Sequence, residues 1–188
     1  MNGRNAFLVM EPIIKVISFL LKIMPSFFLE FLFNLSSGIP TKVGVLLRYI
    51  FIKQLCKSIG RNVYIGRYVT IKNFDKLSLG DNVSIHEYCY IDGIGGIIIG
   101  SNVSIAHASS IISFNHTYEN IHIAIKYNEL EMRNICIGND VWIGCGVRVL
   151  AGTIINERTV VGAGTILNNH YPSSSLIVGI PGRVIKDI

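Results

Sequence analysis

The sequence predicts a mainly β fold, a parallel β-helix of six-residue repeats preceded by an apolar helical segment. Two observations predict it. From Ile59 to the C-terminus, an aliphatic residue followed in most repeats by glycine or another small residue recurs every six positions. The first 58 residues lack this period and carry runs rich in Phe, Leu and Ile. A six-residue period matches neither the 3.6-residue face of a helix nor the alternation of an ordinary strand.

Residues 1–58 form the first of two expected parts. They hold seven basic and two acidic residues, and so account for the whole net charge of +5. Lys15, Lys22 and Glu30 interrupt the apolar runs before they reach the about 20 residues that span a membrane. Glu11-Pro12 ends the first run too early for a secretory signal. We expect two or three short helices that cap the solenoid, lie on an anionic membrane surface, or do both.

Residues 59–188 form the second part, the solenoid itself. Three hexads make one 18-residue coil, and the leading aliphatic residues stack inside, since no single repeat can bury them alone. Two extra residues separate the coils that start at Ile59, Leu79 and Ile99, so we expect a bulge at one corner. A larger interruption of roughly 20 residues, 117–136, is expected to be a loop that carries a binding surface.

His116 stands where a coil ends and this loop begins. An imidazole at such a place is partly desolvated and open to a ligand, which suits it to remove a proton from a hydroxyl. The loop carboxylates Glu119, Glu129 and Glu131 are candidates to orient its other ring nitrogen. The alternative is a histidine on a surface loop with no such role.

Downstream residues offer a surface for a long ligand. Trp142 precedes the leading aliphatic Ile143, so its indole must point outward, where it covers the loop, a subunit contact or a ligand. Small residues at 162–165 and 179–182 let a ligand lie along the backbone, and the cations that follow can meet phosphates. This suits a pantetheine arm that ends in a phosphorylated nucleotide, although the fold alone also explains glycine-rich turns.

Composition bears on which other classes of protein the chain could belong to. The solenoid holds ten basic and ten acidic residues, which offers no basic stripe for nucleic acid. The four cysteines show no CxxC pair, which favours a reduced, cytoplasmic setting. His86 and His107 lie 21 positions apart, close to the repeat of the coils, so a metal-binding or purely structural solenoid stays open as an alternative, although we expect no metal.

The ordered set of His116, the loop, Ile137–Gly144, Val161–Thr165 and Gly179–Ile185 resembles the hexapeptide-repeat, left-handed β-helix acyltransferases. The resemblance is greatest to the branch that contains galactoside, maltose and polysaccharide O-acetyltransferases. It implies a homotrimer that uses acetyl-CoA as co-substrate, with an active site between neighbouring subunits.

The resemblance also implies residue roles on the acceptor side. His116 would be the general base and Glu129 its orienting or sugar-binding carboxylate. Asn115 and Trp142 would line the acceptor cleft. His86 takes the position of a sugar-contacting Asn, which leaves the acceptor's identity open.

On the cofactor side, the resemblance assigns the residues of the last coils. The backbone N–H of Cys145 would steady the oxyanion. Ala163 and Thr165 would flank the pantetheine, while Arg183 and Lys186 would approach the nucleotide phosphates.

The function expected from these residues is acetyl transfer from acetyl-CoA directly to a sugar hydroxyl of a surface polysaccharide or its lipid-linked precursor. We expect it in the cytoplasm or at the inner face of the membrane, with peripheral contact through residues 1–58. N-acetylation of a nucleotide-linked amino sugar and acetylation of a small xenobiotic remain as alternatives.

Overall fold

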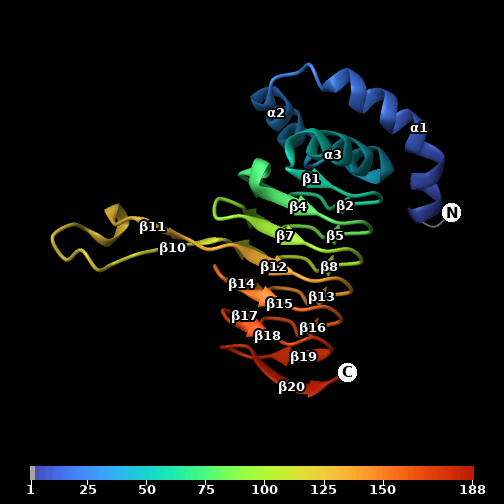
Figure 1. The fold of residues 1–188 in the computed structure, drawn as a ribbon. Coiled ribbons are helices and arrows are strands. Elements are labelled where there is room, and N and C mark those ends of the chain that lie inside the picture. The colour runs from blue at the N-terminus through green and yellow to red at the C-terminus, as the bar shows by residue number, and fades with distance from the viewer. Residues whose placement is uncertain (1–2) are drawn as a thin grey trace.

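The computed structural model describes residues 3–188, a β-helix of parallel strands closed at its first end by three helices (Figure 1). Short strands contribute in turn to three sheets. The solenoid predicted from the six-residue period is thereby confirmed.

The three sheets have the following strands. The first sheet contains β1 (Ser58–Ile59), β4 (Leu77–Leu79), β7 (Ile97–Ile99), β12 (Ile135–Ile137), β15 (Ile154–Ile155) and β18 (His170–Tyr171). The second contains β2 (Tyr64–Ile65), β5 (Ser84–Ile85), β8 (Ser104–Ile105), β13 (Trp142–Ile143), β16 (Val160–Val161), β19 (Ser175–Val178) and β20 (Arg183–Asp187). The third contains β3 (Thr70–Lys72), β6 (Tyr90–Asp92), β9 (Ser110–Ile112), β14 (Arg148–Val149) and β17 (Ile166–Leu167).

The core is a stack of the leading aliphatic residues. In the second sheet the register aligns Ile65, Ile85, Ile105, Ile143 and Val161, and each is 0% exposed. Burying one such side chain contributes about 1.5–3 kcal/mol. Because each coil buries its aliphatic residues against its neighbours, the stack holds the corners of successive coils in line.

The corners of the solenoid account for two features of the sequence: the small residues that follow the leading aliphatic residues, and the two extra residues in each early coil. Where the second sheet turns into the third, coils touch backbone to backbone: a Cβ on Gly144 would lie 2.7 Å from the backbone nitrogen of Ala163. The two extra residues per early coil lie at the corner between the third and first sheets, where one coil forms the short helix η1 (Phe74–Lys76). This is the bulge expected from the sequence.

A long arm, residues 114–132, leaves the solenoid at this last corner, between β9 and β12 (Figure 1). Its stem is an antiparallel ribbon of β10 (Phe114–His116) and β11 (Leu130–Met132), and its tip contains η2 (Ile125–Tyr127). The expected loop 117–136 is therefore partly regular, because its last residues belong to β11 and to the start of β12.

Three helices cover the first coil: α1 (Gly3–Leu21), α2 (Ser26–Ser36) and α3 (Thr41–Leu55). We call residues 3–57 the cap. The helix α3 contacts β2 and η1, and the Tyr49 hydroxyl donates a hydrogen bond to the Gly60 carbonyl at 3.0 Å. The helix α1 is longer than expected, since it continues through Pro12. Across residues 3–188, no helix is both long and apolar enough to cross a bilayer.

The last coil is closed differently. Strand β20 turns back and pairs antiparallel with β19, and all five of its residues are exposed. The two ends of the solenoid are thus a packed helical cap and a single exposed strand.

Candidate active site

His116 lies on the stem of the arm, just outside the solenoid. It ends β10, its side chain is exposed, and its backbone pairs with Leu130 of β11. The Phe114 ring packs edge-on to the imidazole, with ring centroids 6.2 Å apart. The arm therefore presents the imidazole away from the core, where it can meet a ligand or a second subunit.

Thr117 links the two sides of the arm next to His116. Its backbone N–H and its hydroxyl both donate to the Glu129 carbonyl, at 3.0 and 2.8 Å. Opposed residues of an antiparallel ribbon point to the same face and successive residues alternate. Glu129 therefore shares a face with Asn115 and Glu131, whereas His116 points to the other face.

The second group of candidates gathers at the corner between the second and third sheets. Trp142 lies on β13 between Ser104 and Val160 and is 55% exposed, so its side chain points outward as expected. Two residues later the chain turns through 144–146, and the next coil turns through 162–164 directly beside it. We call these two turns the glycine corner.

The glycine corner is open and offers hydrogen-bond donors. A Cβ built on Gly146 or Gly164 would meet no atom within 4 Å. Within the described residues, the backbone N–H groups of Cys145 and Ala163 donate to no acceptor. These N–H groups could pair with the amide oxygens of an extended ligand or with a developing oxyanion.

The two cations expected near phosphates lie on β20, both exposed. Arg183 pairs with Val178 at the end of β19 that reaches the glycine corner, while Lys186 pairs with Leu176 toward the other end. Arg183 is therefore the cation in line with Ala163, and Lys186 lies farther along the sheet.

Thr165 does not share this surface, which corrects the expectation that it flanks the cofactor. Its side chain is 0% exposed, and its hydroxyl donates to the Gly162 carbonyl at 2.8 Å. It lies two residues before the leading aliphatic Leu167, the position that Val147 holds before Val149 in the preceding coil, and both are buried. Thr165 therefore holds the turn from inside the solenoid.

His86 lies at the same corner, two coils before the glycine corner. Its Nδ1 is 3.9 Å from a carboxylate oxygen of Glu87, and its ring lies 5.5 Å from that of Tyr64. The Tyr64 hydroxyl donates to the other Glu87 oxygen at 2.9 Å. The carboxylate also accepts from the backbone of Glu87 itself, and this bond, with the one from Tyr64, holds the pKa of Glu87 below its usual range.

His107 is not stacked on His86. The coil repeat is 20 residues here, and Ala108 N–H donates to the Glu87 carbonyl, so His107 follows Glu87 in the ladder. Across residues 3–188, no group of three His, Cys, Asp or Glu side chains is arranged to hold a metal ion.

Within one chain, the two groups of candidates stay apart. The arm begins at one edge of the third sheet, while His86, Trp142 and the glycine corner lie at or beyond its other edge (Figure 1). A site that uses both groups therefore needs the arm of a neighbouring copy.

Comparison with known proteins gives partial matches in sequence. No protein-family model matches the chain. An Escherichia coli protein named for O-acetyl transfer in lipopolysaccharide biosynthesis is 37% identical over 76 residues, 39% of each chain. The Escherichia coli galactoside O-acetyltransferase is 35% identical over 78 residues, 41% of this chain and 38% of the relative. The matching segment thus spans about two fifths of these relatives, 39% and 38% of their lengths.

Solved structures match over most of the chain. A galactoside acetyltransferase in complex with coenzyme A superimposes with a TM-score of 0.77 at 28% identity, over 89% of this chain and 80% of that one. A maltose O-acetyltransferase from Clostridium difficile 630 gives 0.76 at 24% identity, over 89% and 88%, a likeness of fold. The chain has the left-handed β-helix fold of the hexapeptide-repeat acetyltransferases.

A stacked pair of tyrosines in this hexapeptide-repeat chain was not predicted from the repeat pattern. Tyr68 and Tyr88 stack on each other with ring centroids 5.3 Å apart, and both have a positive φ, 58° and 61°. A left-handed conformation costs a residue with a Cβ about 1–2 kcal/mol. Gly146 and Gly164 hold the equivalent places in the glycine corner. The 20-residue spacing of the two tyrosines was the signal that could have predicted their stacking.

Proposed function

We propose that this chain transfers an acetyl group from acetyl-CoA to a sugar hydroxyl, with a surface polysaccharide or its lipid-linked precursor as the acceptor. The observation that carries the proposal is the similarity to a galactoside acetyltransferase solved with coenzyme A, at 28% identity and a TM-score of 0.77. The relative named for lipopolysaccharide biosynthesis supports a glycan acceptor.

The proposed site forms between copies of a homotrimer. The arm of one copy would bring His116 to the glycine corner of its neighbour. The exposed apolar side chains of the arm support such a contact: Ile121 is 85% and Tyr127 70% exposed. Apolar side chains gathered on a projecting segment are typical of a protein interface.

In the proposed reaction, neutral His116 takes the proton of the sugar hydroxyl as its oxygen attacks the thioester carbonyl carbon. The carbonyl oxygen becomes an oxyanion, which the free N–H of Cys145 would stabilise. The intermediate then collapses, the carbon–sulfur bond breaks, and the coenzyme A thiolate takes the proton from His116. The products are the acetyl ester and free coenzyme A.

The proposed roles of the remaining candidate residues follow from where each lies in the fold. The pantetheine would lie along the glycine corner, with its amides near the N–H of Ala163. Arg183 would meet the nucleotide phosphates, with Lys186 beyond it. On the acceptor side, Trp142, His86 and Asn115 would contact the sugar. Because Glu129 lies on the ribbon face opposite His116, a sugar contact suits its side chain better than orienting the imidazole.

The direct test measures thiol release from acetyl-CoA with a panel of sugars, oligosaccharides, amino sugars and serine, and identifies products by mass spectrometry. The His116→Ala variant is expected to lose about 10²–10⁴-fold in turnover. A variant that kept full turnover on a confirmed acceptor would show that another group is the base. An N-acetylated product would instead establish the amino-sugar alternative.

The same assay separates the two roles of Glu129. In the Glu129→Gln variant, a raised KM with unchanged kcat indicates a sugar contact, whereas a lowered kcat indicates that the carboxylate orients His116.

A further inference from the structure

The cap has a second apolar face that packs against no other part of the chain that the structure describes. In α2, Leu29 and Phe33 are buried toward α3, while Phe27, Phe31 and Leu35, spaced four residues apart, are 72%, 58% and 66% exposed. A helix uses such i, i+4 spacing to present one face. A helix apolar on two sides needs a second apolar surface to cover it.

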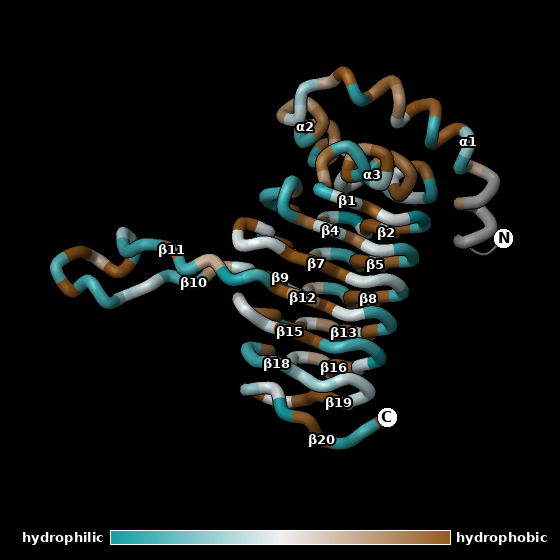
Figure 2. Tube along the Cα trace, viewed as in Figure 1, coloured by the Kyte–Doolittle hydropathy of each residue, from teal (hydrophilic) through white to brown (hydrophobic). Residues whose placement is uncertain are grey.

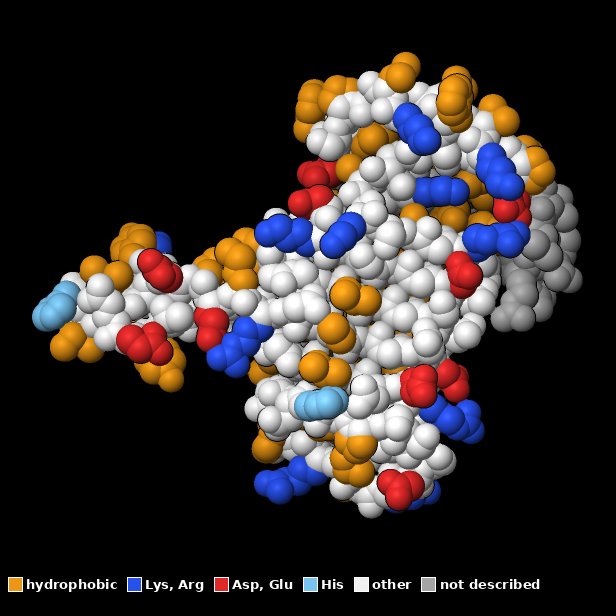
Figure 3. Space-filling model, viewed as in Figure 1, with side chains coloured by type: hydrophobic (Ala, Val, Ile, Leu, Met, Phe, Trp, Pro, Cys, Tyr) orange, Lys and Arg blue, Asp and Glu red, His pale blue; other side chains and the backbone are white. Residues whose placement is uncertain are grey.

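The outer side of α1 continues this surface. Its exposed apolar residues, with the two that follow the helix, are Ile13, Val16, Phe19, Leu20, Ile23 and Met24. Figure 2 shows hydrophobic residues along both helices, and Figure 3 shows hydrophobic side chains at the outer edge of the cap, far from the end that carries β20. We call this surface, the outer faces of α1 and α2, the apolar crown.

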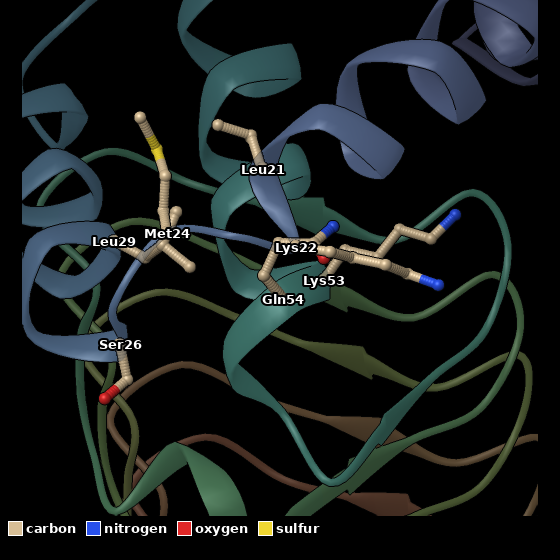
Figure 4. A pocket seen from close by; sticks show the side chains of 7 residues that line it. All are labelled: Leu21, Lys22, Met24, Ser26, Leu29, Lys53 and Gln54. Atoms are coloured by element: carbon tan, nitrogen blue, oxygen red, sulfur yellow. The ribbon is translucent and has the colours of Figure 1, made fainter.

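Lysines lie beneath the apolar crown, nearer the solenoid. Lys22 and Lys53 line one shallow cavity of about 300 Å³ between the end of α1, the start of α2 and α3. Their side chains extend in the same direction from it (Figure 4). Leu21, Met24 and Leu29 form the apolar part of the same cavity. The cavity therefore joins an apolar lining to two cationic ends.

The charges of the cap are mostly positive. Lys15, Lys42 and Lys57 are also exposed. Of the two cap carboxylates, Glu11 already forms ion pairs with Lys15 and Arg61. The cap thus combines an apolar outer face with a basic rim just behind it (Figure 3).

We propose that the apolar crown binds an anionic lipid bilayer, with its Phe, Leu and Ile side chains at the boundary between headgroups and acyl chains. In this arrangement Lys22 and Lys53 hold a lipid phosphate in their cavity. Amphipathic helices that lie in the interface combine these two features, and each Lys near an anionic surface strengthens the binding.

Charge favours this occupant over a second copy of the chain. In a two-fold contact the same patch faces itself, so the rim of lysines would oppose its own copy. Like charges brought together weaken such a contact, whereas anionic headgroups are complementary to them.

The placement has a consequence for the proposed activity. The apolar crown lies at the first end of the solenoid, while the arm and the glycine corner lie on its sides (Figure 1). Binding at that end leaves both groups open to an acceptor held at the membrane. The membrane contact itself does not depend on the proposed acetyl transfer.

The test is flotation of the full chain with vesicles of phosphatidylcholine, with and without phosphatidylglycerol. Binding is expected to the anionic vesicles and to weaken with salt. The triple variant Phe19→Ser, Phe27→Ser, Phe31→Ser is expected to bind at least about tenfold more weakly. Ile98→Ser, at an exposed apolar residue of the solenoid, is the matched control and should bind as the parent chain does.

Two charge-reversal variants test whether the basic rim contributes to vesicle binding. Lys22→Glu/Lys53→Glu should weaken binding by about tenfold or more. Lys76→Glu/Lys126→Glu makes the same change in net charge on the solenoid and arm, and should bind like the parent chain. Urea unfolding midpoints are expected to stay near that of the parent, since the substituted Phe side chains are exposed.

Two outcomes would overturn the proposal. One is equal flotation of the triple Phe variant and the Ile98→Ser control. The other is a parent chain that ignores vesicles while the triple Phe variant has a smaller assembly in sedimentation, which would make the apolar crown a contact between copies. Thiol release with soluble sugars is measured separately, so failure of the proposed enzyme activity would be told apart from failure of membrane binding.

Discussion

Arg48 is a cation enclosed by the cap and the first coil. It is 1% exposed, and its guanidinium donates to the carbonyls of Ile65 at 2.8 Å, Ser36 at 2.9 Å and Ile39 at 3.1 Å. Burial lowers the pKa of Arg48, and the three carbonyls take the place of a carboxylate partner. One side chain thus ties the connection between α2 and α3 to the second sheet.

The Arg48→Ala variant is expected to lose about 3 kcal/mol or more of unfolding free energy, because the guanidinium's bonds to the Ile65 and Ser36 carbonyls are buried and its removal leaves a cavity between the cap and the first coil. Arg48→Lys should recover only part of this, since an ammonium lacks the planar fork that reaches several carbonyls at once. Urea unfolding measures both, and Lys42→Ala, on the same helix and exposed, is the control with a change of about 0.5 kcal/mol or less. A small loss in Arg48→Ala would mean that water replaces the guanidinium.

Single residues show what the repeat pattern could predict. The outward direction of Trp142 followed directly from its place before Ile143. The buried position of Thr165 followed from the same pattern, since residues two before a leading aliphatic also point inward, but its role was taken from the family resemblance alone. Arg48 entered the sequence analysis only as one of the seven basic residues of residues 1–58, because composition carries no information on burial.

The arm is the element that departs most from the solenoid. Its stem is held by the β10–β11 pairing and by the two bonds from Thr117 to Glu129. Beyond the stem, Asn128 is the one buried residue in the segment 118–128. The tip of the arm therefore contributes little to the core of its own chain.

Replacing residues 118–128 by Asn-Gly should leave the solenoid intact, because this dipeptide closes a two-residue hairpin. The unfolding free energy is expected to change by about 1 kcal/mol or less, while kcat/KM for a confirmed acceptor falls by about 100-fold because the arm loses the tip that would place His116 against a neighbouring copy. Circular dichroism with urea and the thiol assay measure the two quantities. Unchanged turnover would remove the arm tip from the active site.

The sequence located the arm but not its form. The break in the six-residue period after Ile111 set its limits within a few residues. The ribbon was missed because three-residue strands such as Leu130–Met132 are too short for alternation to stand out. The apolar crown was anticipated in composition, but only the packing of α2 on α3 shows which residues remain uncovered.

At the scale of the whole molecule, the solenoid separates the two groups of candidate residues that the proposed reaction would bring together. The third sheet stands between the arm and the glycine corner, and stacking of the coils keeps that separation fixed. A rigid scaffold of this kind cannot close on itself to bring the two together. The proposed site is therefore one that an assembly of copies would complete.

Mixing two inactive variants tests this arrangement. His116→Ala removes the base from the arm, and Ala163→Trp fills the glycine corner, where the side chain is exposed. Isolated mixed trimers should regain about one third of the parent turnover, since one of the three pairings in any ring that contains both variants joins an intact arm to an intact corner. Co-expression with two affinity tags isolates the mixed species. Mixed trimers as inactive as either variant alone would place the whole site within one chain.

Strand β20 makes the two ends of the stack of coils unequal in stability. Coils contact only their neighbours, so partial unfolding starts at whichever end is held least. The first end is clamped by Arg48 and the cap, whereas the last end is closed by β20 alone, with every residue exposed. Fraying should therefore begin at the coil that carries Arg183, and a bound nucleotide would tighten the loosest part of the molecule and raise its melting temperature.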